Sequence, residues 1–353
     1  MYSQVLKQKI LNLNKIAKIK KKKTCLFISN TKKTNNNNFY FTPIRETNSH
    51  VYFGIVLFDG QIAKKIAKII DGKFDMLLVD TEKKSRLNNK KIVNIERTIK
   101  RHIKRTYIRF FKANDLTINS AEDFLSFFFK NDVRTLAGKK ILIIGIGNIG
   151  FKLSLRLVER GCYVHLYKKD KKKNDNICRL INDIKPIGTL ASAIPFKNLT
   201  NNLSKFDIII CAADKKNVLK ISKKTKLKTK ILFVDIGKGM FDSISHKILR
   251  HRNILVHRLD VTPSLNMLIA TTNDFKGFER KKIYQIRKIK DYTLVSPGVL
   301  GQKNELIVDN PQNPKIIHGL CDGEGDLISL TSHEKLLILE KISKRIKKKL
   351  LFN

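Results

Sequence analysis

The sequence predicts an α/β fold with two domains, a doubly wound parallel sheet and a smaller α/β domain that precedes it. Short apolar runs alternate with amphipathic helical patterns along most of the chain, and this order of elements is typical of parallel sheets. The 353 residues are also enough for two domains of ordinary size. We expect a first domain over residues 1–118, a second over 119–305, and a C-terminal segment over 306–353.

The first domain is predicted from apolar runs of strand length, with an amphipathic helix at residues 61–70. Because helices separate parallel strands, we expect this domain to be an α/β layer that carries the substrate or catalytic groups. A further helix, capped by Asn119 or Ser120, should connect it to the second domain. The predicted strands are residues 24–29, 51–58, 74–79 and 107–111.

The most informative segment is an apolar strand at residues 141–144 that runs into Gly145, Gly147 and Gly150. A helical pattern follows, and a second apolar strand lies at residues 163–167. This strand, G-x-G-x-x-G loop, helix and strand form the dinucleotide-binding fingerprint of Rossmann domains. Gly145 would allow the tight turn, Gly147 would let the backbone approach the phosphates, and Gly150 would let helix and strand pack closely.

The helix after the loop starts at Asn148 and Ile149, whose backbone N–H groups would face the pyrophosphate together with the positive end of the helix dipole. We therefore predict a Rossmann dinucleotide-binding domain over 119–305. Ala212, directly after a predicted strand, completes the expected cofactor contacts. Further strands are expected at 208–211, 231–235, 255–259 and 293–295, then a short strand at 316–320 and a basic helix at 334–351 that returns to the first domain.

The choice of cofactor depends on the end of the second strand of the fingerprint, where NAD-binding domains carry an acidic residue. This chain has Lys168 and Lys169 there, followed by Asp170. Two lysines favour a 2′-phosphate, so we predict NADP. NAD stays possible through Asp170, since a lysine-rich composition places lysines in any loop.

The net charge of +42 raises the question of nucleic-acid or membrane binding. Lysines are spread over nearly every segment, and no apolar run has the length of a membrane span. We therefore expect no specific nucleic acid, no membrane and a cytoplasmic location. The absence of acidic residues before Glu46 leaves organelle targeting open. The five cysteines contain no C-x-x-C pair and are expected to be reduced core thiols.

The second domain resembles the cofactor domain of D-isomer-specific 2-hydroxyacid dehydrogenases. The similar motifs are Leu136-Ala137-Gly138-Lys139, the glycine loop, 203–210, 234–242, Leu259-Asp260-Val261 and 294–301. The resemblance implies that Lys238 stands where the family has the arginine that orients the substrate carboxylate, and that Asp260 contacts the nicotinamide amide. The chain departs from the family in lacking its glutamate after Val261 and in having Gly298 at the histidine position.

A second resemblance, to methylenetetrahydrofolate dehydrogenase and shikimate dehydrogenase, includes L-x-G-K before the cofactor strand, Val234-Asp235-Ile236-Gly237, and residues 297–301. Together these similarities imply an NAD(P)-dependent dehydrogenase or reductase that acts on a carbonyl or hydroxyl of a small anionic substrate. Lys238, just past a strand end, is the predicted catalytic residue; His257 and His318 are other candidates for the missing proton carrier.

Two alternatives remain at this stage, a non-catalytic dinucleotide sensor or scaffold and a basic nucleic-acid-binding protein. A homodimer is also left open. We expect no metal site, because the acidic segment from Asp322 to Asp326 lacks the glycine and glutamate that an EF-hand requires.

Overall fold

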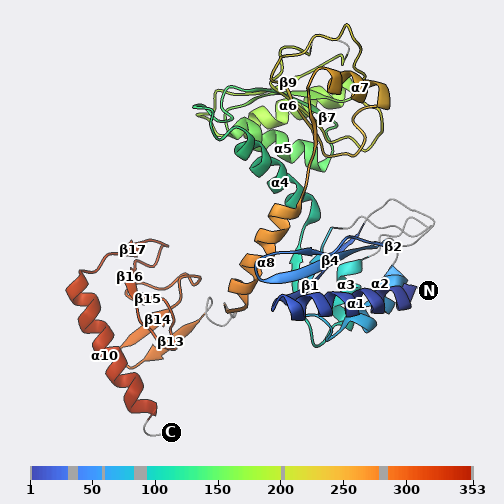
Figure 1. Cartoon of the computed structure of the whole chain (residues 1–353). Coiled ribbons are helices and arrows are strands. Elements are labelled where there is room, and N and C mark those ends of the chain that lie inside the picture. Colours follow the sequence, from blue (N-terminus) through green and yellow to red (C-terminus); the bar gives the residue numbers. More distant parts are fainter. Residues whose placement is uncertain are drawn as a thin grey trace. The chain divides into compact units, whose positions relative to one another are not determined.

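The computed structural model of the chain describes residues 2–30, 39–57, 60–82, 94–199, 203–277 and 285–350 (Figure 1). The chain divides into two compact units, Met1–Leu268 and Ile269–Asn353. Parallel strand pairing dominates both sheets of the first unit, and the second unit contains a smaller mixed sheet. This architecture confirms the predicted fold class. The division after residue 268 differs from the expected boundary at 305.

The first sheet has the strand order β2-β4-β1-β5-β6, with β3 paired to β4. Strands β4, β1, β5 and β6 are parallel, as predicted, whereas β2 and β3 pair with β4 in the antiparallel direction. Phe58, the last residue of a predicted strand, lies outside the described residues. The bounds are β1 Lys23–Asn30, β2 Phe39–Phe41, β3 Arg45–Glu46, β4 His50–Leu57, β5 Met76–Asp80 and β6 Tyr107–Phe111, with α2 Gly60–Ile70 and α3 Ile95–His102.

The chain begins with a helix that the sequence analysis did not predict, α1 (Tyr2–Ile19), drawn in blue in Figure 1. Leu6, Ile10, Leu13 and Ala17 recur at helical spacing and are all buried in the core beneath the first sheet. Their burial means that the basic start of the chain is part of this core.

Helix α4 (Ala113–Phe128) follows the first sheet and begins earlier than predicted. The backbone N–H of Ala113 donates to the carboxylate of Asp80, and that of Asn114 donates to Glu82, both at 3.2 Å. These distant carboxylates satisfy the helix start, which its own N-cap residue leaves without a side-chain hydrogen bond. The expected caps, Asn119 and Ser120, lie inside the helix.

The second sheet has the order β12-β11-β10-β7-β8-β9, and each pair of neighbours is parallel. The chain reverses its direction of progress between β7 and β10, which makes the sheet doubly wound. The bounds are β7 Lys140–Ile144, β8 Tyr163–Tyr167, β9 Ala193–Pro195, β10 Ile208–Cys211, β11 Leu232–Asp235 and β12 Val256–Arg258, with α5 Asn148–Glu159, α6 Lys171–Ile184, α7 Ser243–His251 and α8 Thr262–Gly277.

The third sheet, in the second unit, has the order β13-β14-β15-β16-β17. Residues 293–295 form a strand, but in β14 of this sheet and not in the doubly wound sheet. The reason is the preceding β13, which forms a hairpin with β14 around Lys290, a residue with a positive φ of 47°. The bounds are β13 Ile286–Ile289, β14 Tyr292–Val295, β15 Leu306–Val308, β16 Ile317–Cys321, β17 Leu327–Ile328 and α10 Ser332–Leu350.

The predicted C-terminal helix is α10, which packs on the third sheet of its own unit. Ile342 is fully buried among Leu306, Val308 and Ile317. Leu351, the predicted last residue of this helix, lies outside the described residues. Within the described part of the chain, no helix combines the length and apolar character that a bilayer crossing requires. The five cysteines are all buried and none forms a disulfide.

His165 in β8 should make the stability of the first unit depend on pH. Its side chain lies against the rings of Phe196 and Phe206, and burial, aided by the charges of Lys205 and Lys140, lowers its pKa from 6.5 to about 4. The folded state favours neutral histidine, so the part of the free energy of unfolding that depends on neutral His165 is fully present above pH 6.5. It is lost as pH falls from 6.5 toward 4, by about 3 kcal/mol at most. Urea unfolding at pH 7 and pH 4.5 should show a smaller loss for His165→Leu than for the unmodified chain; equal losses would contradict this.

Candidate dinucleotide-binding site

The glycine loop between β7 and α5 uses its three glycines differently. Gly145 has a φ of 93°, and a Cβ added there would meet the backbone nitrogen of Ala213 at 2.5 Å. A Cβ at Gly150 would collide with the carbonyl oxygen of Gly145. At Gly147, by contrast, nothing lies within 4 Å of an added Cβ. Two glycines are therefore needed for packing, and the third borders open space of the kind that an approaching pyrophosphate requires.

Helix α5 begins at this loop with its N-terminal donors directed out of the helix. Gly147 is the N-cap and provides no side-chain acceptor. The first backbone hydrogen bond of the helix runs from the N–H of Phe151 to the carbonyl of Gly147, at 2.9 Å. The N–H groups of Asn148, Ile149 and Gly150 precede this bond, so they lack an acceptor in the helix and suit an anion.

The ends of β7, β10 and β11 meet around Ala213, which the sequence analysis did not single out. Ala213 lies against Gly145 on one side, and on the other its carbonyl oxygen occupies the space of a Cβ at Gly237. The predicted Ala212 donates its N–H to the carbonyl of Ile144 at 2.8 Å, beside the glycine loop. The small residues that follow β10 and β11 in the sequence could have indicated this meeting point, because only small residues let three backbones approach so closely.

Lys168 and Lys169 follow β8, whose end is fastened to the glycine loop. The N–H of Gly145 donates to the carbonyl of Tyr167 at 3.1 Å. The two lysines are the next two residues after Tyr167, so they follow directly on a residue that is bonded to the loop. Lys168 is half-buried and Lys169 is exposed. Asp170, which the sequence left as a possible NAD ligand, is the N-cap of α6 and accepts the N–H of Lys173 at 3.0 Å.

Lys238 lies on a tight turn after β11. The carboxylate of Asp235 accepts the backbone N–H groups of Lys238, Gly239 and Met240 at 3.0, 2.7 and 3.2 Å. Lys238 has a φ of 66°, a left-handed conformation that is uncommon for a residue with a side chain. The turn holds an exposed lysine at the carboxyl end of the sheet, the edge where doubly wound sheets bind ligands.

Asp260 follows β12 and is attached to the same strand end. The N–H of Leu259 donates to the carbonyl of Asp235 at 3.1 Å. The carboxylate of Asp260 accepts the N–H and the hydroxyl of Thr262, at 3.0 and 2.6 Å. Partial burial opposes ionisation of Asp260, but these hydrogen bonds and the charge of Arg45 hold its pKa below its usual value. Asp260 is therefore an ionised acceptor near neutral pH.

Sequence comparison agrees with this geometry. Residues 128–260 match the Shikimate / quinate 5-dehydrogenase family model. The match begins in α4 and ends at Asp260, so it includes the glycine loop, the turn at Lys238 and every strand of the doubly wound sheet. The resemblance to shikimate dehydrogenase is thus confirmed for this domain, and the comparison with 2-hydroxyacid dehydrogenases stays a prediction.

The curated relatives are similar over a shorter segment. The glycerol-3-phosphate dehydrogenase (NAD(P)+) of Clostridium botulinum is 32% identical over 106 residues, which are 29% of this chain and 32% of that protein. The glutamyl-tRNA reductase of Thermosipho melanesiensis is 26% identical over 102 residues, which are 29% of this chain and 26% of that protein. The matched region therefore spans about a third or less of each relative.

Solved structures show only a distant likeness. The L-tryptophan dehydrogenase of Nostoc punctiforme is 12% identical, with 74% of this chain and 76% of that chain covered and a TM-score of 0.42. A shikimate dehydrogenase in complex with NADP+ is 15% identical, with 70% and 86% covered and a TM-score of 0.38.

The two candidate histidines lie in different surroundings. His257, in β12 of the doubly wound sheet, packs against the rings of Phe124 and Phe128, whose centroids lie 5.5 and 5.7 Å from that of the imidazole. This packing favours a structural role. His318 is exposed on β16 in the second unit.

The acidic segment near residue 322 forms a turn. One carboxylate oxygen of Asp322 accepts the N–H groups of Glu324, Gly325 and Asp326, at 2.8 to 3.0 Å. Among the described residues there is no group of three or more side chains with the arrangement of a metal site.

Proposed function

We propose that the chain is an NAD(P)-dependent oxidoreductase that acts on a carbonyl or hydroxyl group of a small anionic substrate. The observation that carries this proposal is the glycine loop at the point where the doubly wound sheet reverses, with open space beside Gly147 and N–H groups at the start of α5 that have no acceptor in the helix. The match of residues 128–260 to a dehydrogenase family supports it.

Different groups of the chain would bind different parts of the cofactor and the substrate. The N–H groups from Asn148 to Gly150 would hold the pyrophosphate, and Ala212 and Asp260 would border the nicotinamide end. Lys238 would contact the substrate or carry a proton. The cofactor, once bound, supplies the hydride chemistry, and no protein residue needs to do so.

We also propose NADP as the preferred cofactor, because Lys168 and Lys169 follow the strand that is fastened to the glycine loop. Charge-assisted contacts of two lysines to a 2′-phosphate should favour NADPH over NADH by at least about tenfold. Lys168→Asp combined with Lys169→Ala should shift this preference toward NADH in fluorescence titrations. The same charge change in the exposed pair Lys223→Asp and Lys224→Ala should leave it unaltered. Equal affinity of the unmodified chain for both cofactors would remove the basis of the proposal.

A second candidate is a dinucleotide sensor without catalytic activity, favoured by the packing of His257 against phenylalanines and by glycine at position 298. Cofactor titration followed by assays with shikimate, quinate and pyruvate separates the possibilities. Turnover supports the enzyme, and tight NADPH binding without turnover supports the sensor. Absence of cofactor binding, with salt-sensitive binding to nucleic acid, would support the basic nucleic-acid-binding alternative.

A further inference from the structure

A residue of the first sheet is connected to the start of α8, close to Asp260 in the sequence. Tyr52 in β4 is only 2% exposed, and its hydroxyl donates to the side-chain oxygen of Asn266 at 3.0 Å. Figure 1 shows β4 and α8 beside each other at this point. Burial raises the pKa of Tyr52 to about 12, so the phenol stays protonated and remains a donor. The contact joins residues 214 positions apart and connects the first sheet to α8, the helix that follows the doubly wound sheet.

Arg45 lies on the same face of the first sheet as Tyr52. The two residues are direct partners in the antiparallel pairing of β3 with β4, and directly opposed residues project from one face. Partial burial raises the pKa of Asp260, but hydrogen bonds from Thr262 lower it and the charge of Arg45 adds to that lowering. Burial raises the pKa of Tyr52, and the charge of Arg45 opposes that rise. Arg45 is exposed, and within the described part of the chain no carboxylate lies within ion-pair distance of it.

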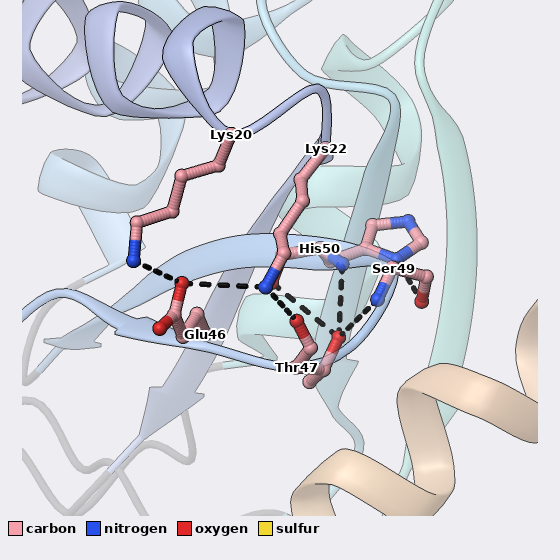
Figure 2. A network of polar contacts seen from close by, with 6 residues as sticks. All are labelled: Lys20, Lys22, Glu46, Thr47, Ser49 and His50. Atoms are coloured by element: carbon pink, nitrogen blue, oxygen red, sulfur yellow. Dashed lines mark hydrogen bonds and ion pairs between the residues drawn. The ribbon is translucent and has the colours of Figure 1, made fainter.

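The neighbouring carboxylate does not neutralise Arg45, because Glu46 is engaged elsewhere. Figure 2 shows Glu46 with Lys20 and Lys22, whose ammonium groups lie 2.6 and 3.3 Å from its carboxylate. Successive residues of a strand point to opposite faces, so Glu46 and Arg45 serve different sides of the sheet. The charge of the Arg45 guanidinium is therefore not neutralised by the carboxylate next to it in the strand.

This region continues to the cofactor edge of the doubly wound sheet. Leu259, next to Asp260, is hydrogen-bonded to Asp235, and the carboxylate of Asp235 holds the turn of Lys238. The backbone hydrogen bond of Leu259 therefore joins the segment of Asp260 to the predicted nicotinamide end. A small molecule near Asp260 would meet a guanidinium from one sheet and a strand end from the other.

We propose that Arg45 binds the carboxylate of the substrate, which we infer to be a small hydroxy- or oxo-carboxylate. This inference rests on the proposed oxidoreductase function and names the group that recognises the anion. The planar guanidinium fork matches a carboxylate with two parallel hydrogen bonds. A singly charged carboxylate also fits the local charge better than a doubly charged phosphate, because the ionised Asp260 repels additional negative charge. Asp260 would accept a hydrogen bond from the substrate hydroxyl.

Calorimetric titration of the full chain saturated with NADP+ tests this assignment with shikimate and its uncharged methyl ester as probes. The acid should bind at least about tenfold more tightly than the ester, since only the acid offers a carboxylate. In Arg45→Ala most of this preference for the acid should be lost. Arg45→Lys should retain part of it, because lysine keeps the charge without the fork. Arg97→Ala, at an exposed arginine on α3, is the matched control and should retain the full ratio.

NADPH affinity of the same proteins separates failure of this inference from failure of the proposed function. Arg45→Ala should bind NADPH as the unmodified chain does, because the cofactor loop lies in another sheet. If the unmodified chain does not bind NADPH, the oxidoreductase proposal itself is wrong. If it binds NADPH but not shikimate, or if Arg45→Ala keeps the acid-to-ester ratio, the inference about Arg45 is wrong.

Discussion

Replacing Gly147 with valine should weaken NADPH binding by roughly a hundredfold while leaving the fold intact. The loss follows from distance: a branched side chain would occupy the space beside the start of α5 and hold the pyrophosphate away from the N–H groups there. Losing one or two charge-assisted hydrogen bonds costs about 3 kcal/mol, which corresponds to that factor. The fold should survive because nothing lies within 4 Å of an added Cβ and the φ of −88° suits valine.

Gly188→Val is the matched control for this experiment. Gly188 is also surrounded by open space and carries the same chemical change, but it lies in an exposed loop after α6. Fluorescence titration with NADPH and thermal unfolding should be measured for both variants. A Gly147→Val protein that unfolds like the unmodified chain and binds NADPH equally well would show that the pyrophosphate is not bound at this loop.

Gly145 and Gly150 cannot serve the same purpose, because substitution there acts on the fold. A side chain at either position meets backbone atoms of Ala213 or Gly145, so something in the sheet or in α5 must move. A loss of cofactor binding in those variants would report misfolding as readily as a lost contact. Of the three glycines in the motif, only Gly147 can therefore be substituted to test cofactor binding without disturbing the fold.

The doubly wound sheet could be predicted closely from the sequence. Strands β7, β8, β10 and β11 are short apolar runs that are buried almost throughout, and such runs between glycines, turns and helical patterns leave few alternatives. The glycine positions in the loop were equally readable, because their spacing reflects the local geometry of one turn.

Features that depend on distant partners could not be read in the same way. The start of α4 is decided by Asp80 and Glu82, which precede it by more than a local turn, so the nearby Asn119 and Ser120 were the natural but wrong caps. The meeting of Tyr52 with Asn266 depends on how two parts of the first unit pack. Strand β14 shows the same limit, because its residues suit either sheet and only the hairpin with β13 decides between them.

Helix α1 was missed for a different reason. Its buried positions repeat at helical spacing, so the signal was present, but the high density of lysine and the absence of acidic residues led to a basic start without an assigned element. Composition describes the exposed face of such a helix, whereas the apolar spacing describes the face that packs.

Substitution of Lys238 is the second change expected to have a large effect on function. The left-handed backbone conformation of this residue determines which variant is best for the test. Alanine would keep the left-handed conformation, which costs roughly 1 kcal/mol for a residue with a Cβ. Lys238→Gly removes the ammonium group and relieves that strain, so the turn built on Asp235 should be as stable as before or more so. Loss of function in the glycine variant would therefore report the side chain alone.

We expect Lys238→Gly to raise the substrate KM at least about tenfold, with Lys238→Arg retaining part of the affinity, because both long side chains carry a positive charge toward an anionic substrate. If Lys238 instead moves the proton, both variants should lower kcat, by about a hundredfold or more, since guanidinium stays protonated at any working pH. Steady-state kinetics with the NADPH concentration held saturating distinguishes the two cases. If both variants keep the kcat and KM of the unmodified chain, Lys238 is a surface lysine. The search for the proton carrier should then move to His257, His318 and the first sheet, where the Tyr52 hydroxyl contacts Asn266.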